Sequence, residues 1–176
     1  RVAVSELNLI HHPDGILKKH TESEVCTSCH AKVRADLHKA SAHPIRHGLV
    51  TCTDCHSPHG SAGPKALHTL TRNETCFRCH AEKRGPFLWE HEPASEDCGV
   101  CHTPHGSNNP ALLVRRPPLL CQECHQLSAG ASNAGHVNNR LAWGSGNARL
   151  LFGANCMNCH SQVHGSTHPS GAALQR

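Results

Sequence analysis

The chain has 176 residues, a formal net charge of +4 and a mean hydropathy of −0.47, with three Phe, two Trp and no Tyr. Because 14 Gly and 11 Pro interrupt it at short intervals, this composition excludes an ordinary apolar core of long helices or strands. Arg and Lys are scattered singly, so we expect no nucleic-acid partner. No apolar run approaches the roughly 18 residues of a membrane span, so we expect no transmembrane segment.

All twelve cysteines lie in six CXXCH motifs, in which a histidine directly follows the second cysteine. Motifs 1 to 6, in chain order, consist of Cys26, Cys29 and His30; Cys52, Cys55 and His56; Cys76, Cys79 and His80; Cys98, Cys101 and His102; Cys121, Cys124 and His125; and Cys156, Cys159 and His160. In c-type cytochromes the two thiols of this motif add to the vinyl groups of one porphyrin, and the imidazole binds its iron as the proximal ligand. A single CXXC would also suit a redox dithiol, a zinc site or a disulfide. The histidine after all six copies favours six haem c groups.

Six porphyrins would supply the apolar surface that the sequence lacks. We therefore expect a multihaem cytochrome c fold, mostly coil with short α-helices and turns wrapped around a closely packed haem chain, and with little or no β-sheet. We expect residues 1–176 to form a single hexahaem domain. Within it, the sequence predicts three two-haem repeats at approximately residues 21–66, 71–112 and 116–170.

Each repeat contains two further histidines at similar places. One series, the middle histidines, lies between the two motifs of a repeat and comprises His43, His91 and His136. The other series, the closing histidines, follows the second motif and precedes a glycine; it comprises His59, His105 and His164. Six haems need six distal ligands, and these two series supply that number. We expect the glycines to permit close passage of a porphyrin face.

Two alternatives stay open for the distal ligands. One or two of the six histidines are ordinary polar residues in the first alternative, and the substitutes would be His11, His12, His20, His38, His47, His68 or His168. The sequence also leaves open which distal histidine serves which haem. For His105 we expect a haem other than the one attached at motif 4, so that the segment CGVCHTPHG joins two redox centres.

The chain's single methionine, Met157, lies between the two cysteines of motif 6, where it cannot reach the opposite face of the ring. We therefore expect bis-histidine ligation and low reduction potentials at every iron. Irons with two protein ligands have no open position, which predicts electron transfer and no catalytic site. Covalent haem attachment also implies export to the periplasm or beyond.

Four stretches of the sequence resemble a known family: ETCFRCHAEKRGPFLWEHEP, EDCGVCHTPHGSNNPALL, PPLLCQECHQ and CMNCHSQVHGSTHPSG. They are similar to the decahaem cytochromes of the MtrA/DmsE group, with the densest match over residues 48–171. The resemblance implies bis-histidine haems in a periplasm-facing conduit of the outer membrane that passes respiratory electrons to acceptors outside the cell. It implies other multihaem cytochromes as redox partners, and an outer-membrane porin. The departure is the haem number, six in place of ten.

Other functions remain as alternatives. A filament-forming cytochrome would use the same haems but stack chains end to end, and His11, His12 or His20 would then ligate a neighbouring chain's haem. A catalytic multihaem reductase would need an open iron, which regular motifs do not mark. Zinc binding is the remaining alternative for the cysteines.

Overall fold

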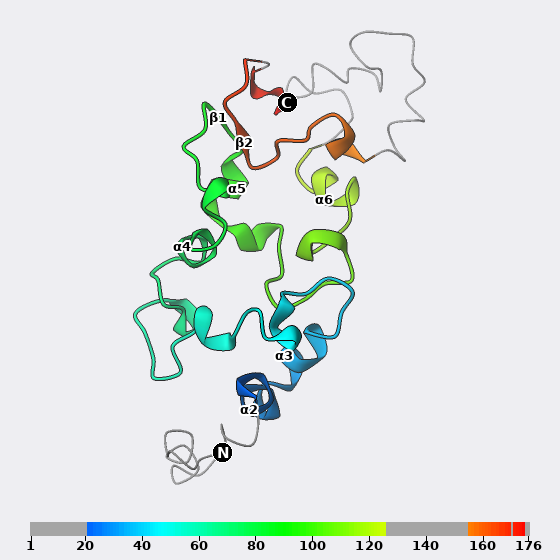
Figure 1. Cartoon of the computed structure of the whole chain (residues 1–176). Coiled ribbons are helices and arrows are strands. Elements are labelled where there is room, and N and C mark those ends of the chain that lie inside the picture. Colours follow the sequence, from blue (N-terminus) through cyan, green and yellow to red (C-terminus); the bar gives the residue numbers. More distant parts are fainter. Residues whose placement is uncertain (1–20, 126–154, 170, 175–176) are drawn as a thin grey trace. The chain divides into compact units, whose positions relative to one another are not determined.

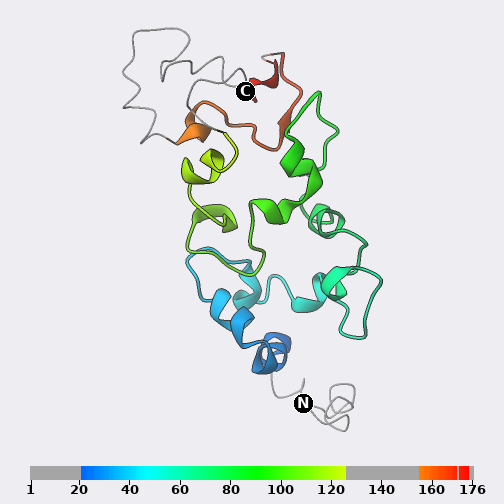
Figure 2. The same ribbon diagram turned by 180° about the vertical axis from the view of Figure 1, so that it is seen from behind.

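The computed structural model describes residues 21–125, 155–169 and 171–174 as short elements joined by coil (Figures 1 and 2). The α-helices are α2 (Glu22–Cys29), α3 (Ala31–Asp36), α4 (Arg72–Phe77), α5 (Glu92–Glu96) and α6 (Leu119–Gln122). The 3₁₀ helices are η3 (Pro44–His47), η4 (Cys52–Asp54), η5 (Pro64–Ala66), η6 (Ala81–Lys83), η7 (Cys98–Val100), η8 (Pro110–Leu112), η10 (Cys156–Asn158) and η11 (Gly171–Ala173). The longest described helix has eight residues.

Extended structure is confined to very short pairings. The strands β1 (Trp89–Glu90) and β2 (Gly165–Ser166) form an antiparallel two-stranded sheet, and it is the only sheet among the described residues. Three isolated bridges among the described residues have the same antiparallel sense: Ser41 with Ser107, His56 with Leu67, and His102 with Leu113. The predicted fold class, mostly coil with short helices and little or no β-sheet, is confirmed.

The described residues contain almost no apolar core. Leu37, at 4% exposure, is the one apolar side chain among them that is fully buried. The other buried side chains are polar: Thr27, Asn73, Thr75, Ser107 and Ser166. The exclusion of an ordinary core, drawn from composition, therefore holds for this part of the chain. No described helix is long and apolar enough to cross a membrane.

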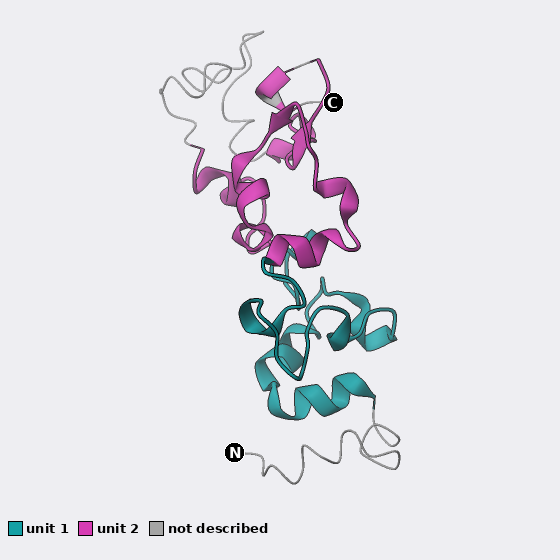
Figure 3. Ribbon diagram, turned by 90° about the vertical axis from the view of Figure 1, so that its left-hand side faces the viewer, with its two compact units in different colours: residues 1–71, 103–112 teal, residues 72–102, 113–176 magenta. Residues whose placement is uncertain are grey.

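The chain divides into two compact units (Figure 3). Unit 1 comprises residues 1–71 and 103–112 and carries motifs 1 and 2, whereas unit 2 comprises residues 72–102 and 113–176 and carries motifs 3 to 6. The chain passes from unit 2 to unit 1 directly after His102, so that His102 and His105 belong to different units. This division differs from the three predicted repeats, which stay a prediction.

Every CXXCH motif is closed by the same backbone turn. The N–H of the proximal histidine donates to the carbonyl oxygen of the first cysteine at 2.8–3.0 Å in all six motifs. Motifs 1, 3 and 5 begin in the helices α2, α4 and α6, and motifs 2, 4 and 6 begin in η4, η7 and η10. One turn of helix thus brings both thiols and the imidazole to neighbouring positions, as the motif spacing predicts.

The segments after motifs 2, 4 and 6 also share one geometry. Each returns through a 3₁₀ helix to a residue with positive φ, whose carbonyl oxygen accepts a hydrogen bond from the backbone just after the motif. The three bonds run from Ser57 to Ala66 at 2.8 Å, from Thr103 to Leu112 at 2.8 Å, and from Gln162 to Leu174 at 2.9 Å. These loops hold the closing histidines between their two ends.

Within unit 2, side chains of helix α4 form hydrogen bonds with the residues at the start of motif 4 and just before it. The buried Asn73 donates from Nδ2 to the carbonyl oxygen of Ser95 at 2.9 Å, and its Oδ1 accepts from the backbone N–H of Cys98 at 2.7 Å. Arg72 donates from one nitrogen to both carboxylate oxygens of Asp97 at 2.9 and 3.0 Å. Both contacts fix the helix that carries motif 3 against the turn that carries motif 4.

Unit 1 has an equivalent contact made by a different residue. The carboxylate of Glu22 accepts from the backbone N–H of Thr53 at 2.7 Å and from its hydroxyl at 3.1 Å. Glu22 and Arg72 both lie four residues before the first cysteine of their motif, Cys26 and Cys76 respectively. The position, and not the residue type, is therefore what the two units share.

The substitution Asn73→Ala should lower the free energy of unfolding of the holoprotein by about 2 kcal/mol, because a backbone N–H and a carbonyl in a buried region lose their partner. Guanidinium unfolding followed by circular dichroism measures it. The matched control is Asn158→Ala at an exposed position within motif 6, for which we expect less than about 0.5 kcal/mol. Equal losses in the two variants would contradict the role given to Asn73.

Candidate functional site

The first cysteines of successive motifs meet in three pairs. Side-chain hydrogen bonds join Cys26 to Cys52, Cys76 to Cys98, and Cys121 to Cys156. Each pair thus brings together the first attachment points of two motifs, 1 with 2, 3 with 4, and 5 with 6. These are the two motifs that the sequence places in one repeat.

Burial dominates the acidity of these thiols. It raises the pKa of Cys52 to about 12, with the adjacent Cys26 as the next cause, and it raises the pKa of Cys121 to about 11, with Cys156 as the next cause. Zinc binds thiolates, so thiols that resist ionisation are poor zinc ligands. The one described cluster with metal-ligand spacing, Glu22 with Cys26 and Cys52, offers only three ligands where a structural zinc site has four. The chemistry of this donor set therefore suits thioether attachment better than zinc.

Among the described residues, three pairs of histidine rings lie close together with nearly parallel planes. The ring centroids of His56 and His105 are 6.1 Å apart, those of His91 and His125 are 6.0 Å apart, and those of His102 and His164 are 6.1 Å apart. The angles between the ring planes are 26°, 25° and 12°, in the same order.

This spacing is the one that two ligands of a single iron require. Two imidazoles on opposite sides of one metal ion, with metal–nitrogen bonds of about 2 Å, have ring centroids roughly 6 Å apart. An ordinary pair of half-buried aromatic rings can show the same distance. However, each described pair joins one predicted proximal ligand to one predicted distal ligand. The residues present therefore fit two axial ligands of a haem iron.

Hydrogen bonds to backbone carbonyls fix the tautomer of three of these predicted ligands. The acceptor of His43 Nδ1 is the oxygen of Pro104 at 2.5 Å, that of His56 Nδ1 is the oxygen of Lys65 at 3.0 Å, and that of His91 Nδ1 is the oxygen of Val163 at 2.9 Å. A carbonyl oxygen only accepts, so in the neutral ring Nδ1 carries the proton and Nε2 keeps the lone pair that a metal binds. The same arrangement orients metal-ligating histidines in general.

The surroundings of two closing histidines, His105 and His164, favour the neutral form of the imidazole. Burial lowers the pKa of His105, and the neighbouring His56 lowers it further. Burial also lowers the pKa of His164, with Lys83 as the next cause. Because only a neutral imidazole nitrogen can bind iron, both shifts favour the ligating form.

The remaining predicted ligands lie at the ends of elements or in loops. His30 ends α2, His80 precedes η6, His160 follows η10, and His59 is exposed in the loop after motif 2. His136 lies outside the described residues. Their use as ligands stays a prediction.

The structure also bears on the alternative ligands. His68 donates from Nε2 to the carbonyl oxygen of Thr53 at 2.8 Å, which commits that nitrogen to a structural bond within unit 1. His38, His47 and His168 are exposed. The remaining three, His11, His12 and His20, lie outside the described residues.

The glycines after two closing histidines serve a purpose that sequence reasoning missed. A Cβ at Gly106 would overlap the carbonyl oxygen of Asp36, at the end of α3, and a Cβ at Gly165 would overlap the ring of Phe87. The close neighbour is thus protein in both places, where the sequence suggested a porphyrin face. Pairs of residues so far apart along the chain leave no local signal.

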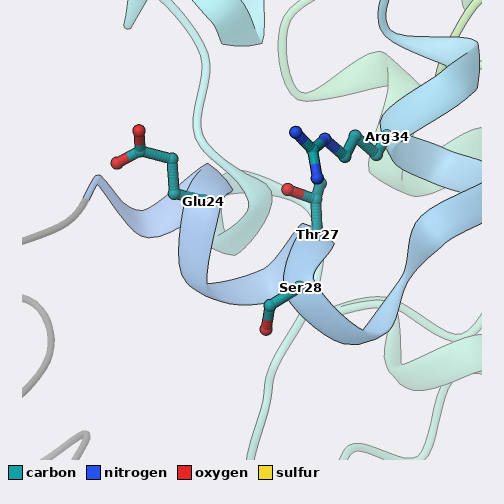
Figure 4. Close-up of a pocket in the computed structure, with 4 residues that line it drawn as sticks. All are labelled: Glu24, Thr27, Ser28 and Arg34. Atoms are coloured by element: carbon teal, nitrogen blue, oxygen red, sulfur yellow. The ribbon is translucent and has the colours of Figure 1, made fainter.

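Figure 4 shows a depression formed by Glu24, Thr27 and Ser28 of α2 with Arg34 of α3. Its lining is polar and includes no cysteine and no predicted iron ligand. The hydroxyls of Thr27 and Ser28 donate to the backbone carbonyl oxygens of Ser23 and Val25 and not to a general base. The depression therefore gives no support to a catalytic reading of this part of the chain.

Comparisons with known proteins agree with the site chemistry. Residues 43–85 and 91–130 match the family model of the doubled CXXCH motif. The whole chain is 53% identical, over 176 residues, to the multiheme cytochrome MtrA of Shewanella baltica (strain OS185). The paired CXXCH motifs and this similarity support a multihaem c-type cytochrome of the MtrA group. The chain spans about half (53%) of the length of that relative.

The two matched segments begin and end at different residues from the predicted repeats. The first segment contains motifs 2 and 3, and the second contains motifs 4 and 5. Each begins at a middle histidine, His43 or His91. The CXXCH motifs and the similarity to MtrA support haem c as the cofactor.

The substitution Gly106→Ala should displace His105 from His56, because the new methyl group overlaps backbone of α3 that cannot rotate away. We expect a loss of about 2 kcal/mol in the free energy of unfolding of the holoprotein, with a change in its low-spin spectrum. The control is Gly60→Ala, which follows the closing histidine His59. It has a φ of 99° but no atom within 4 Å of the new Cβ, so only backbone strain of about 1 kcal/mol applies. A larger effect in the control would contradict this reading.

Proposed function

We propose that this cytochrome is an electron-transfer protein that carries six haem c groups, each with two histidine ligands. The observation that carries the proposal is the set of three histidine pairs at 6.0–6.1 Å, because that spacing suits an iron with both axial positions filled. One-electron oxidation and reduction are the chemistry that haem iron supplies when bound. The residues of the chain would hold the irons and set their separation.

The proposed ligand set keeps the predicted residues and assigns a pair of histidines to each of three irons. His56 and His105 ligate the iron at motif 2, His102 and His164 the iron at motif 4, and His91 and His125 the iron at motif 5. The other proposed proximal ligands are His30, His80 and His160, and the other proposed distal ligands are His43, His59 and His136. The twelve cysteines, two for each motif, form the thioether bonds.

Two imidazoles on an iron leave it no position for a substrate, which is why we propose a carrier or conduit and no catalytic role. A methionine ligand would have raised the potential, but Met157 has its place between the cysteines of motif 6. Low potentials at all six sites follow from this ligand set.

Contacts between cysteines support an order for the sites within unit 2. The thiol of Cys76 is hydrogen-bonded to that of Cys98, and the thiol of Cys121 to that of Cys156. Cys124 lies close enough to Cys101 to raise the pKa of that thiol, after the larger effect of burial. The sites of motifs 3, 4, 5 and 6 would then be neighbours in that order. Electron transfer along unit 2 would follow the sequence of the chain.

The cellular role is also a proposal. Covalent haem attachment and the similarity to MtrA support an exported bacterial protein, in the periplasm or at the outer membrane, that serves extracellular respiration. Its partners would be other multihaem cytochromes, with an outer-membrane porin as a further candidate. Self-association into a longer wire is the alternative assembly.

The haem count is tested on the purified holoprotein. Intact-mass spectrometry should give the chain plus six haems, and the ferric protein should show only low-spin signals in electron paramagnetic resonance. Carbon monoxide should leave the reduced spectrum unchanged because every axial position is occupied. A high-spin signal equivalent to one haem per chain, with carbon monoxide binding, would instead indicate a catalytic site.

The pairing is tested by His105→Ala. We expect the haem at motif 2 to lose low-spin ligation and its potential to rise, while the haem at motif 4 keeps both properties, because His105 lies beside His56. Assigned haem methyl resonances in nuclear magnetic resonance distinguish the two sites. The exposed His47 gives the control, since His47→Ala should change neither haem. Loss of ligation at motif 4 would refute the pairing.

A further inference from the structure

Two short strand pairings each bring a middle histidine opposite a closing histidine. In the sheet of β1 and β2 (Figure 1), the register pairs Trp89 with Ser166 and Glu90 with Gly165. Continued by one residue, this register places His91 opposite His164. We call residues 89–91 together with 163–166 the unit 2 clasp.

Unit 1 contains an equivalent pairing. The bridge between Ser41 and Ser107 sets a register that places His43 opposite His105. Residues 41–43 together with 104–107 are the unit 1 clasp. Each clasp therefore joins one histidine of each predicted distal series.

A hydrogen bond crosses each clasp at the same place. The middle histidine donates from Nδ1 to the carbonyl oxygen of the residue just before the closing histidine. His91 uses the oxygen of Val163, and His43 uses the oxygen of Pro104. The carbonyl group that accepts the hydrogen bond from the middle histidine therefore belongs to the same peptide unit as the backbone N–H of the closing histidine.

The two histidines of the unit 2 clasp belong to different sites. His91 pairs with His125 of motif 5, whereas His164 pairs with His102 of motif 4. The peptide between Val163 and His164 therefore touches the ligand sets of two motifs at once.

Both clasps are supported from behind, by unrelated groups. In unit 2 the ring of Phe87 occupies the space that a side chain at residue 165 would need, and Ser166 is 5% exposed. In unit 1 the backbone of Asp36 occupies the equivalent space beside Gly106, and Ser107 is 6% exposed. Such close packing limits how far the acceptor carbonyl can move without moving the closing histidine.

We propose that the unit 2 clasp couples the haems of motifs 4 and 5 through the hydrogen bond from His91 to Val163. This inference rests on the proposed function, because it needs both histidines to ligate iron. A ligand imidazole whose Nδ1 proton is held by an acceptor is a stronger donor to its metal. With His91 bound to an oxidised iron, its Nδ1 proton would be more acidic and its hydrogen bond to Val163 stronger, which would pull on the peptide that carries His164. Val163 and His91 are thus positioning residues for the neighbouring site.

The test replaces the ligand by a small molecule that does or does not donate the proton. His91→Gly holoprotein is supplied with imidazole, which can ligate iron and donate to Val163, or with 1-methylimidazole, which can only ligate. Both should restore low-spin ligation at motif 5. With 1-methylimidazole the ratio of reduced to oxidised haem at motif 5, at a fixed ambient potential, should be about three- to tenfold higher, the size of one net hydrogen bond. The resonances of the haem at motif 4 should shift between the two.

The matched control is His164→Gly with the same two molecules. For His164 no bond from Nδ1 to a carbonyl is found in the described part of the chain, so it reports the intrinsic difference between the two azoles. The inference requires a larger difference in His91→Gly than in this control. Equal differences, with motif 4 unaffected, would overturn the coupling and leave the proposed function intact. An unchanged spin state at motif 5 in His91→Gly would overturn the proposed ligation itself.

A second variant covers the case in which His91→Gly does not mature. Gly165→Ala keeps every ligand but displaces the clasp against Phe87, so the potentials at motifs 4 and 5 should move together. In Gly60→Ala, where the new Cβ meets nothing, those two potentials should stay in place. A shift at motif 4 alone in Gly165→Ala would contradict the coupling.

Discussion

Under the proposed function, the need to bring two histidines to each iron is the constraint on which this structure depends. The proximal histidine is fixed by its own motif, through the turn that returns its N–H to the first cysteine. The distal histidine then has to come from a distant part of the chain, as His105 does for His56 and His164 for His102. With one buried apolar residue, Leu37, among the described residues, apolar packing within the chain contributes little to this arrangement. Ligand geometry and polar contacts such as those of Asn73 take its place, as in small metal-dependent domains.

The sequence predicted haem c as the cofactor and a coil-rich fold, because both follow from local spacing and composition. CXXCH requires one helical turn, and six copies required a coil-rich fold without a core. The pairing of ligands was beyond reach, because contacts such as His91 with His125 join distant segments. The acceptors on Pro104 and Val163 are backbone oxygens, which every residue has and no motif marks. For the same reason the close approach of Gly106 to the backbone of Asp36 could not be predicted.

The histidine contacts bear on where one repeat ends and the next begins. The matched family segments 43–85 and 91–130 begin at middle histidines, whereas the sequence suggested repeats that begin before motifs 1, 3 and 5. His91 and His125 fall inside one matched segment, but His56 and His105 join two of them. Neither frame isolates a self-sufficient ligand set. An array whose neighbouring segments supply each other's ligands can be lengthened by further copies, and the relative in Shewanella baltica is about twice as long as this chain.

The central claim is that the closing histidines His105 and His164 each serve the motif two places before the one they follow, and not the motif they follow. The most direct measurement is a high-resolution structure of the holoprotein that shows which nitrogen atoms bind the iron attached at Cys98 and Cys101. The account predicts Nε2 of His102 on one side and a nitrogen of His164 on the other, with His105 bound at the iron of motif 2. An iron at motif 4 bound by His105 would contradict it.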